Sequence, residues 1–222
     1  MNTTVDVDDF RRRIGSFAPD THAPGRILAM YSGAIALADD MALTAAVVAG
    51  RRRGVPREGF YEMVLQSYLF LGFPRMLTAA EHLSAQYKER TMDADLEPVS
   101  GDEASEWFER GVRLCRRVYD DNYDRLRRRV MRMAPDVFRW MVFEGYGKVL
   151  SRPGVDPVDR ELAIIACLMI EDRPKQLFSH IKGALNVGAA PEVVRLVIED
   201  IGLSAGAGYR SALEIAERLE LT

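Results

Sequence analysis

Apolar residues recur at helical spacing along most of the chain, and no segment keeps the strict alternation of a half-buried strand. Proline opens several of these segments, as expected at a first helical position, and Gly54, Gly72, Gly188 and Gly206 end helices or turns. The pattern therefore predicts an all-α fold. The clearest helices are expected at Pro56–Leu71, Pro74–Lys88, Asp102–Tyr119, Pro135–Leu150, Asp156–Glu171, Pro174–Val187, Pro191–Leu203 and Tyr209–Leu221.

Near the middle of the chain, the stretch Thr91–Gly101 is polar, acidic and interrupted by proline. Such a composition is typical of a linker. We therefore expect two helical units, at residues 1–95 and 96–222.

The two units are related in sequence. A shift of 134 residues places Arg26–Gly72 over Arg160–Gly206 without a gap. An internal match with an Arg-x-Leu-Ala helix start and two turn glycines predicts a tandem duplication. The identical pairs are Arg26/Arg160, Leu28/Leu162, Ala29/Ala163, Leu43/Leu177, Gly54/Gly188, Glu58/Glu192, Leu69/Leu203 and Gly72/Gly206.

The two copies differ at several polar positions. Where one copy is polar and the other apolar, folding alone does not require the polar residue. The first copy lacks the polar residues of the second at the pairs His180/Ala46, Gln176/Ala42, Glu161/Ile27 and Asn186/Arg52, the last of which exchanges an amide for a cation. We therefore look for a site in the second unit.

Composition excludes several classes of partner. The formal net charge is −3, so no global charge draws the chain to nucleic acid or an anionic membrane. The strongly apolar run Leu162–Ile170 is too short to cross a bilayer, and Met1–Phe10 has no apolar signal core. We expect a cytoplasmic protein. Cys115 and Cys167 lie far apart in the sequence and form no CxxC motif, and both are expected to be buried.

His180 is the main candidate for chemistry, because imidazole transfers protons near neutral pH. Gln176 lies one turn earlier on the same helix face. Glu161 stands at the start of the preceding helix, where capping or an ion pair would also account for a carboxylate. The two helices could bring Glu161 to His180 within the chain or only across a subunit boundary. Asn186 follows on the His180 helix.

Arg152, in the rigid turn Ser151-Arg152-Pro153-Gly154, could bind an anionic substrate or be a solvated turn residue. Glu144 and Tyr146 end the helix that leads into this turn and are candidates for pocket lining. The arginine runs at 11–13, 51–53 and 125–129 are expected on solvated faces, and His22 and His82 are expected to be isolated and exposed.

Three motifs of the second unit occur in a set order: Ser151-Arg152-Pro153-Gly154-Val155, Arg160-Glu161-Leu162-Ala163, and His180-Ile181-Lys182-Gly183-Ala184-Leu185-Asn186-Val187-Gly188, with Gly206 beyond them. On these residues the segment Gly111–Leu219 resembles the carboxymuconolactone decarboxylase family of the alkylhydroperoxidase-D-like superfamily. Leu71-Gly72-Phe73-Pro74 is similar to the same unit in a degenerate form.

The resemblance implies an alkylhydroperoxidase-D-like helical fold, a small-molecule substrate and homo-oligomeric rings of the trimer or hexamer kind. The peroxidases of the superfamily use a CxxC pair between a Glu and a His. Arg173 and Gln176 hold the cysteine positions here, so disulfide exchange is excluded. The decarboxylases work without a cofactor or metal. By the resemblance, His180 would supply a proton, Arg152 would bind a carboxylate, and Glu161 would orient the imidazole or relay a proton.

This chain departs from the decarboxylase pattern at Tyr146, where a tryptophan is usual, and at Glu161, where a serine often follows the arginine. The leading hypothesis is a decarboxylase-like lyase that acts on a small carboxylated or enolisable substrate. The alternative is a non-catalytic binding or assembly protein on the same scaffold. A cavity on which His180 and Arg152 converge would favour catalysis, and a tightly packed His180 would oppose it. A redox protein would need Cys115 or Cys167 exposed near a cation.

Overall fold

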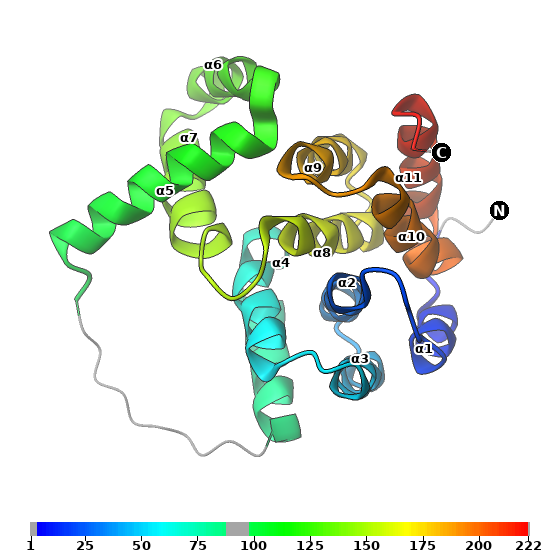
Figure 1. The fold of residues 1–222 in the computed structure, drawn as a ribbon. Coiled ribbons are helices and arrows are strands. Elements are labelled where there is room, and N and C mark those ends of the chain that lie inside the picture. Colours follow the sequence, from blue (N-terminus) through cyan, green and yellow to red (C-terminus); the bar gives the residue numbers. More distant parts are fainter. Residues whose placement is uncertain (1–3, 88–97, 222) are drawn as a thin grey trace.

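The computed structural model describes residues 4–87 and 98–221, which form helices and no strand, so the all-α prediction is confirmed (Figure 1). The α-helices are α1 (Val7–Gly15), α2 (Ala23–Leu37), α3 (Asp40–Arg52), α4 (Arg57–Tyr87), α5 (Gly101–Tyr119), α6 (Tyr123–Met133), α7 (Pro135–Trp140), α8 (Pro157–Ile170), α9 (Pro174–Val187), α10 (Pro191–Ile201) and α11 (Ala207–Arg218). Short 3₁₀ turns η1 (Asp120–Asn122) and η3 (Gly202–Ala205) and a π-helical segment η2 (Met141–Leu150) complete the set.

Local sequence signals account for many helix boundaries. The Asp39 carboxylate accepts a hydrogen bond from the Ala42 backbone N–H at 2.9 Å and so caps α3. Gly188 ends α9 in the left-handed conformation, at φ 110°. Gly72 breaks α4 at φ 80° and ψ 166°, and this break separates the two helices that the sequence predicts on either side of it.

Helix α8 forms the centre of the molecule. Every residue from Arg160 to Ile170 is buried, and α2, which is buried from Gly25 to Ala36, packs along it (Figure 1). Side chains from both predicted units therefore join one hydrophobic core. No helix of the described residues is long and apolar enough to cross a membrane.

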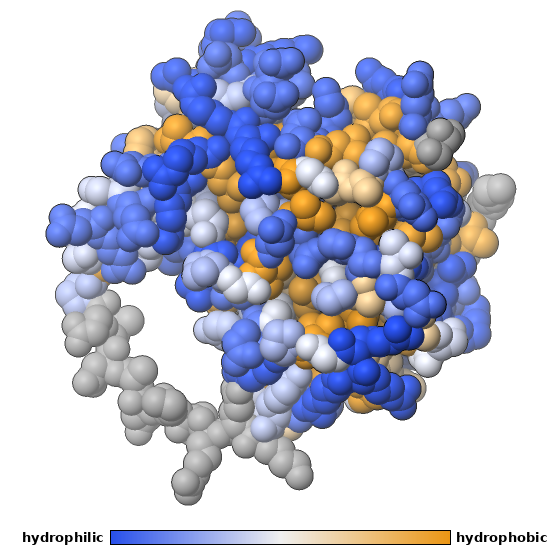
Figure 2. Space-filling view, viewed as in Figure 1, coloured by the Kyte–Doolittle hydropathy of each residue, from blue (hydrophilic) through white to orange (hydrophobic). Residues whose placement is uncertain are grey.

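The structure has helices that the sequence analysis does not list, namely α1, α2, α3 and α6. It also divides the predicted helix Pro135–Leu150 into α7 and the wider η2. Figure 2 shows hydrophilic residues over the α5–α6 corner, where Arg125, Arg127, Arg128 and Arg129 are exposed as expected.

Helix starts follow the sequence repeat. Helices α2, α3 and α4 begin at residues 23, 40 and 57, and α8, α9 and α10 begin 134 residues later, at 157, 174 and 191. The duplication itself stays a prediction. The predicted linker Thr91–Gly101 lies, for residues 91–97, outside the described residues, so the boundary between units also stays a prediction.

Candidate functional site

The structure brings Glu161 and His180 together within one chain. Glu161 lies in the first half of α8, and His180 lies in α9, which packs against α8 after a short turn. The Glu161 Oε2 and His180 Nδ1 atoms are 2.8 Å apart. Both side chains are buried, with exposed fractions of 3% and 8%. A buried carboxylate–imidazole hydrogen bond fixes the orientation of the ring.

This contact also assigns the tautomer of the imidazole. An ionised carboxylate can only accept hydrogen bonds, so Nδ1 carries a proton and donates a hydrogen bond to Glu161. The lone pair of the neutral ring is then on Nε2, which has no hydrogen-bond partner within residues 4–87 and 98–221. Nε2 is therefore the nitrogen available to a ligand.

Two neighbours shape the space around the pair. The Phe70 ring of α4 meets the His180 ring edge-on, with 5.5 Å between centroids. A Cβ atom at Gly183 would lie 3.0 Å from Glu161 Oε2 and 2.8 Å from Val118 Cγ1. Because Gly183 has no side chain, the Glu161 carboxylate has room at this position.

A buried group of aromatic and thiol side chains adjoins Glu161. Tyr119 and Tyr146 share a hydrogen bond, and burial raises the pKa of Tyr119 to about 12 and that of Tyr146 well above its ordinary value. Burial likewise raises the pKa of Cys115 to about 12, with a smaller contribution from the nearby Glu161 charge. These side chains stay protonated at neutral pH. Tyr146, predicted as pocket lining, is buried, and it interacts electrostatically with Glu161.

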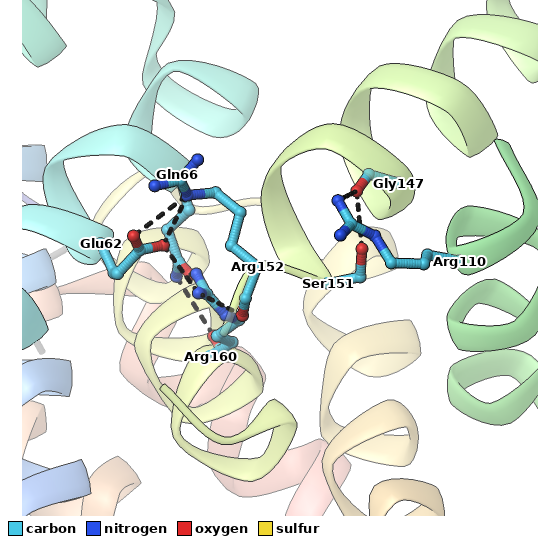
Figure 3. A network of polar contacts seen from close by, with 7 residues as sticks. All are labelled: Glu62, Gln66, Arg110, Gly147, Ser151, Arg152 and Arg160. Carbon is cyan, nitrogen blue, oxygen red and sulfur yellow. Dashed lines mark hydrogen bonds and ion pairs between the residues drawn. The ribbon is translucent and has the colours of Figure 1, made fainter. Parts of the chain in front are cut away.

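A second polar group joins α4, the start of α8 and the turn that precedes α8 (Figure 3). Glu62 of α4 accepts hydrogen bonds from Arg152 Nε, at 3.0 and 3.1 Å, and from Arg160 Nη2, at 2.8 Å. Gln66, one turn later on α4, accepts a hydrogen bond from Arg160 Nη1 at 3.3 Å. Arg152 thus binds Glu62 in the structure, and Arg160 is a buried partner in the same group.

The other predicted site residues lie elsewhere. Gln176 is exposed near the start of α9. Asn186 donates from Nδ2 to the Val118 backbone oxygen at 2.8 Å and so ties α9 to α5. Glu144 accepts a hydrogen bond from the Tyr68 hydroxyl at 2.9 Å, which ties η2 to α4. Their roles as substrate contacts stay predictions.

The histidines expected to be isolated both have partners. His22 Nε2 lies 2.5 Å from Asp159 Oδ1, although the His22 side chain is about one-third exposed (36%). His82 Nε2 lies 3.0 Å from Thr44 Oγ1. Both expectations of isolation are wrong, because the partners come from helices distant in sequence.

Both cysteines are buried, and neither forms a disulfide. Burial raises the pKa of Cys167 to about 12, as it does for Cys115. The Cys167 thiol donates to the Ser32 backbone oxygen. Neither cysteine therefore has the exposure that the redox hypothesis requires.

Two surface pockets lie beside α1, away from His180. One, of about 430 Å³, lies between α1 and α3 and includes Phe17 and Thr44. The other, of about 310 Å³, includes Arg13 and Arg26. His180 and Arg152 line neither of them.

Sequence reasoning did not identify Glu62, Gln66, Phe70 or Tyr119 as part of these groups. The available signal was the polar pair Glu62 and Gln66, four residues apart in an otherwise apolar part of α4. Their spacing placed them on one helix face but did not reveal that they meet Arg152 and Arg160.

Comparison with known proteins finds a family that part of the chain resembles. The model of the carboxymuconolactone decarboxylase family matches residues 135–218, so this segment is similar to that family. The match includes Glu161, His180 and Arg152 but not Glu62 or Phe70. Over 164 residues the chain is 29% identical to "Peroxisomal protein 2" of Schizosaccharomyces pombe. The aligned segment covers 69% of this chain and 73% of that protein. The name of this relative refers to the peroxisome, so the cytoplasmic location expected from the sequence stays a prediction.

Proposed function

We propose that this chain is an acid–base enzyme in which His180 transfers a proton through Nε2 and Glu161 positions the imidazole through Nδ1. The observation that carries the proposal is the buried 2.8 Å contact between Glu161 Oε2 and His180 Nδ1. The carboxymuconolactone decarboxylase family domain at residues 135–218 supports it. The proposed reaction is of the lyase class, without a bound cofactor, on a small carboxylated or enolisable acid.

The proposed reaction is a decarboxylation followed by protonation of carbon. Loss of carbon dioxide breaks a carbon–carbon bond and leaves the electron pair on a carbon whose charge is delocalised into a neighbouring carbonyl. His180, which has taken up a proton from water at Nε2, then donates that proton to the carbon and returns to the neutral form with its lone pair on Nε2. The Glu161 carboxylate stabilises the charged imidazolium before this transfer and holds the ring in place afterwards.

Thiol peroxidase chemistry is not part of the proposal. That reaction needs an accessible thiolate, and burial raises the pKa of Cys115 and Cys167 to about 12. Arg173 and Gln176 stand at the positions of the exchanging cysteines. Assembly into a ring of identical subunits is proposed on the family resemblance alone.

A second candidate function is a non-catalytic binding or assembly protein on the same scaffold. The observation in its favour is that the two pockets beside α1 are not lined by His180 or Arg152. Arg152 binds Glu62 rather than converging on the imidazole. Under this alternative the Glu161–His180 pair would serve only to stabilise the packing of α8 on α9.

A substrate screen distinguishes the two. Small lactone acids and keto acids are incubated with the wild-type protein, His180→Ala and the matched histidine control His22→Ala, and carbon dioxide release is measured. The acid–base proposal predicts release by the wild type and by His22→Ala and none by His180→Ala. If His180→Ala keeps its fold and oligomeric state and releases as much carbon dioxide as the wild type does, the acid–base proposal is contradicted.

A further inference from the structure

The His180 imidazole is covered, although its Nε2 atom has no hydrogen-bond partner among the described residues. Only 8% of the side chain is exposed, and Glu161 holds the other ring nitrogen. The two surface pockets beside α1 do not include His180. A small acid can therefore reach Nε2 only after a neighbouring side chain has moved aside.

Phe70 of α4 is the side chain that lies between the imidazole and the surface. Its ring meets the His180 ring edge-on, with 5.5 Å between centroids. Phe70 is itself only half-buried, and so are Leu69 and Leu71 on either side of it. A residue that contacts the imidazole and is also partly exposed forms a cover one side chain thick. Displacement of the Phe70 ring would thus open His180 to solvent.

A hydrogen bond fastens this part of α4 to η2. The Tyr68 hydroxyl donates to Glu144 Oε1 at 2.9 Å. Burial raises the pKa of Tyr68 above its ordinary value, so the phenol keeps its proton at neutral pH. Both side chains are only partly buried, and water can replace either partner of the bond. The contact is therefore a fastening that can open at small cost.

Helix α4 breaks two residues after Phe70. Gly72 has φ 80° and ψ 166°, a backbone conformation that favours glycine. Beyond the break the Phe73 ring stacks on the Tyr68 ring, with 5.0 Å between centroids and 15° between planes. Phe73 is 59% exposed. Because the helical hydrogen-bond ladder is interrupted at Gly72, the segment that ends there can shift without bending a continuous helix.

We propose that Phe70 is a gate that controls access to His180 Nε2, and that the Tyr68–Glu144 hydrogen bond holds the gate closed. This inference rests on the proposed function, since it concerns entry to the same imidazole. When the hydrogen bond opens, the end of the first part of α4 shifts at Gly72 and the Phe70 ring leaves the imidazole. Glu144, which the sequence suggested as pocket lining, is part of the fastening.

Modification by diethylpyrocarbonate, read by peptide mass spectrometry, tests the gate without any assay of activity. The reagent acylates an unprotonated imidazole nitrogen, which in neutral His180 is Nε2. Wild-type His180 should react at least about tenfold more slowly than it does in the urea-unfolded protein. Phe70→Ala should raise the His180 rate by at least about tenfold, because the cover is gone. Tyr68→Phe removes only the hydroxyl and should raise the rate by about threefold.

Two controls accompany these variants. Tyr61→Phe removes a hydroxyl from an exposed tyrosine two turns earlier on α4 and should leave the His180 rate unchanged. His22 lies at the start of α2 and should react at one rate in all of these folded proteins.

Equal His180 rates in the wild type, Phe70→Ala and Tyr68→Phe would overturn the gate. So would a wild-type His180 that reacts as fast as it does in the unfolded chain. A Tyr68→Phe protein in which the His22 rate rises as much as the His180 rate would contradict the fastening, because the loss of structure would then be general. Failure of the acid–base proposal would appear separately, as turnover that persists in His180→Ala.

Discussion

At the scale of single residues, the contact between Glu161 and His180 combines two properties that a catalytic histidine needs. The buried carboxylate fixes the ring and its tautomer, and Nε2 remains without a protein partner in the described residues. The neighbouring Tyr119 and Tyr146 are kept protonated because burial raises the pKa of both phenols.

Replacement of the carboxylate tests its role apart from that of the imidazole. Glu161→Gln keeps the size of the side chain but removes the charge that stabilises the imidazolium. We expect turnover to fall by about two to four orders of magnitude while the fold is retained. Steady-state kinetics across pH 5–9 measure this, with Glu161→Asp as the conservative control. A Glu161→Gln variant with the wild-type rate and pH profile would show that the carboxylate is structural.

The buried thiols predict how stability depends on alkaline pH. Burial raises the thiol pKa of Cys115 from 9.0 to about 12 in the folded protein. Above pH 9 the unfolded chain loses the thiol proton and the folded chain keeps it, so the contribution to stability is full below pH 9 and is lost as pH rises toward 12.

Urea unfolding at pH 8 and pH 9.8 measures this loss. Each buried thiol should contribute a loss of roughly 1 kcal/mol over this range. The buried tyrosines, which ionise in the unfolded chain near pH 10, add to the total decline equally in both proteins, so the difference from Cys115→Ala isolates the thiol. The decline should be smaller in Cys115→Ala, which has no thiol at this position. Equal declines in the two proteins would mean that the Cys115 thiol is accessible to solvent in the folded state.

At the scale of helices, close packing of α5 against η2 depends on two glycines. A Cβ atom at Gly147 would lie 2.0 Å from the Trp107 backbone oxygen, and one at Gly111 would lie 2.0 Å from that of Val142. These distances are far below van der Waals contact, and both obstacles are backbone atoms that cannot rotate away. The two helices can approach this closely only because neither position has a side chain.

Gly147→Ala should therefore destabilise the protein by more than about 2 kcal/mol, through forced separation of α5 and η2. Gly145→Ala is the matched control, because a Cβ at Gly145 meets no atom within 4 Å. Thermal unfolding of both variants provides the comparison. Similar melting temperatures for the two would contradict the close approach.

The helices that sequence reasoning identified differ in kind from those it did not. Starts of α8, α9 and α10 were predictable because each has a proline in its first turn. Helix α2 shows little periodicity because it is buried at every residue from Gly25 to Ala36, and a helix surrounded by protein has no polar face. The π-helical form of η2 arises from packing and has no counterpart in the periodicity.

The site was predictable in part for similar reasons. The pairs His180/Ala46 and Glu161/Ile27 directed attention to two residues that the structure brings into contact. Glu62 was not predictable, because an acid on a helix is ordinarily solvated and its meeting with Arg152 depends on how α4 crosses α8.

At the scale of the whole molecule, two arginines that lie 134 residues apart are each bound by the opposite half of the chain. Arg26 of α2 donates to both oxygens of Asp200 on α10, at 2.8 and 2.7 Å. Arg160, 134 residues later, donates to Gln66 of α4, which itself lies 134 residues before Asp200. Helix α2 is thus held by α10, and α8 is held by α4, around the central contact of α2 with α8.

Removal of one of these cross-contacts should weaken the whole fold. Arg26→Ala leaves the largely buried Asp200 carboxylate without its partner and should cost about 3 kcal/mol of unfolding free energy. The control is Arg53→Ala, because Arg53 pairs with the exposed Asp20 and its loss should leave stability unchanged. Urea unfolding should give a single transition in each. Two separate transitions in Arg26→Ala would indicate units that fold independently.

The central claim is that His180 Nε2 transfers a proton to the substrate, and hydrogen exchange at the substrate carbon tests it most directly. An acid turned over by the wild type is incubated in D₂O with wild type, His180→Ala and His22→Ala, and deuterium incorporation is followed by NMR. We predict equal incorporation by wild type and His22→Ala, and a loss of at least about 100-fold in His180→Ala. Undiminished incorporation by a folded His180→Ala protein would contradict the account.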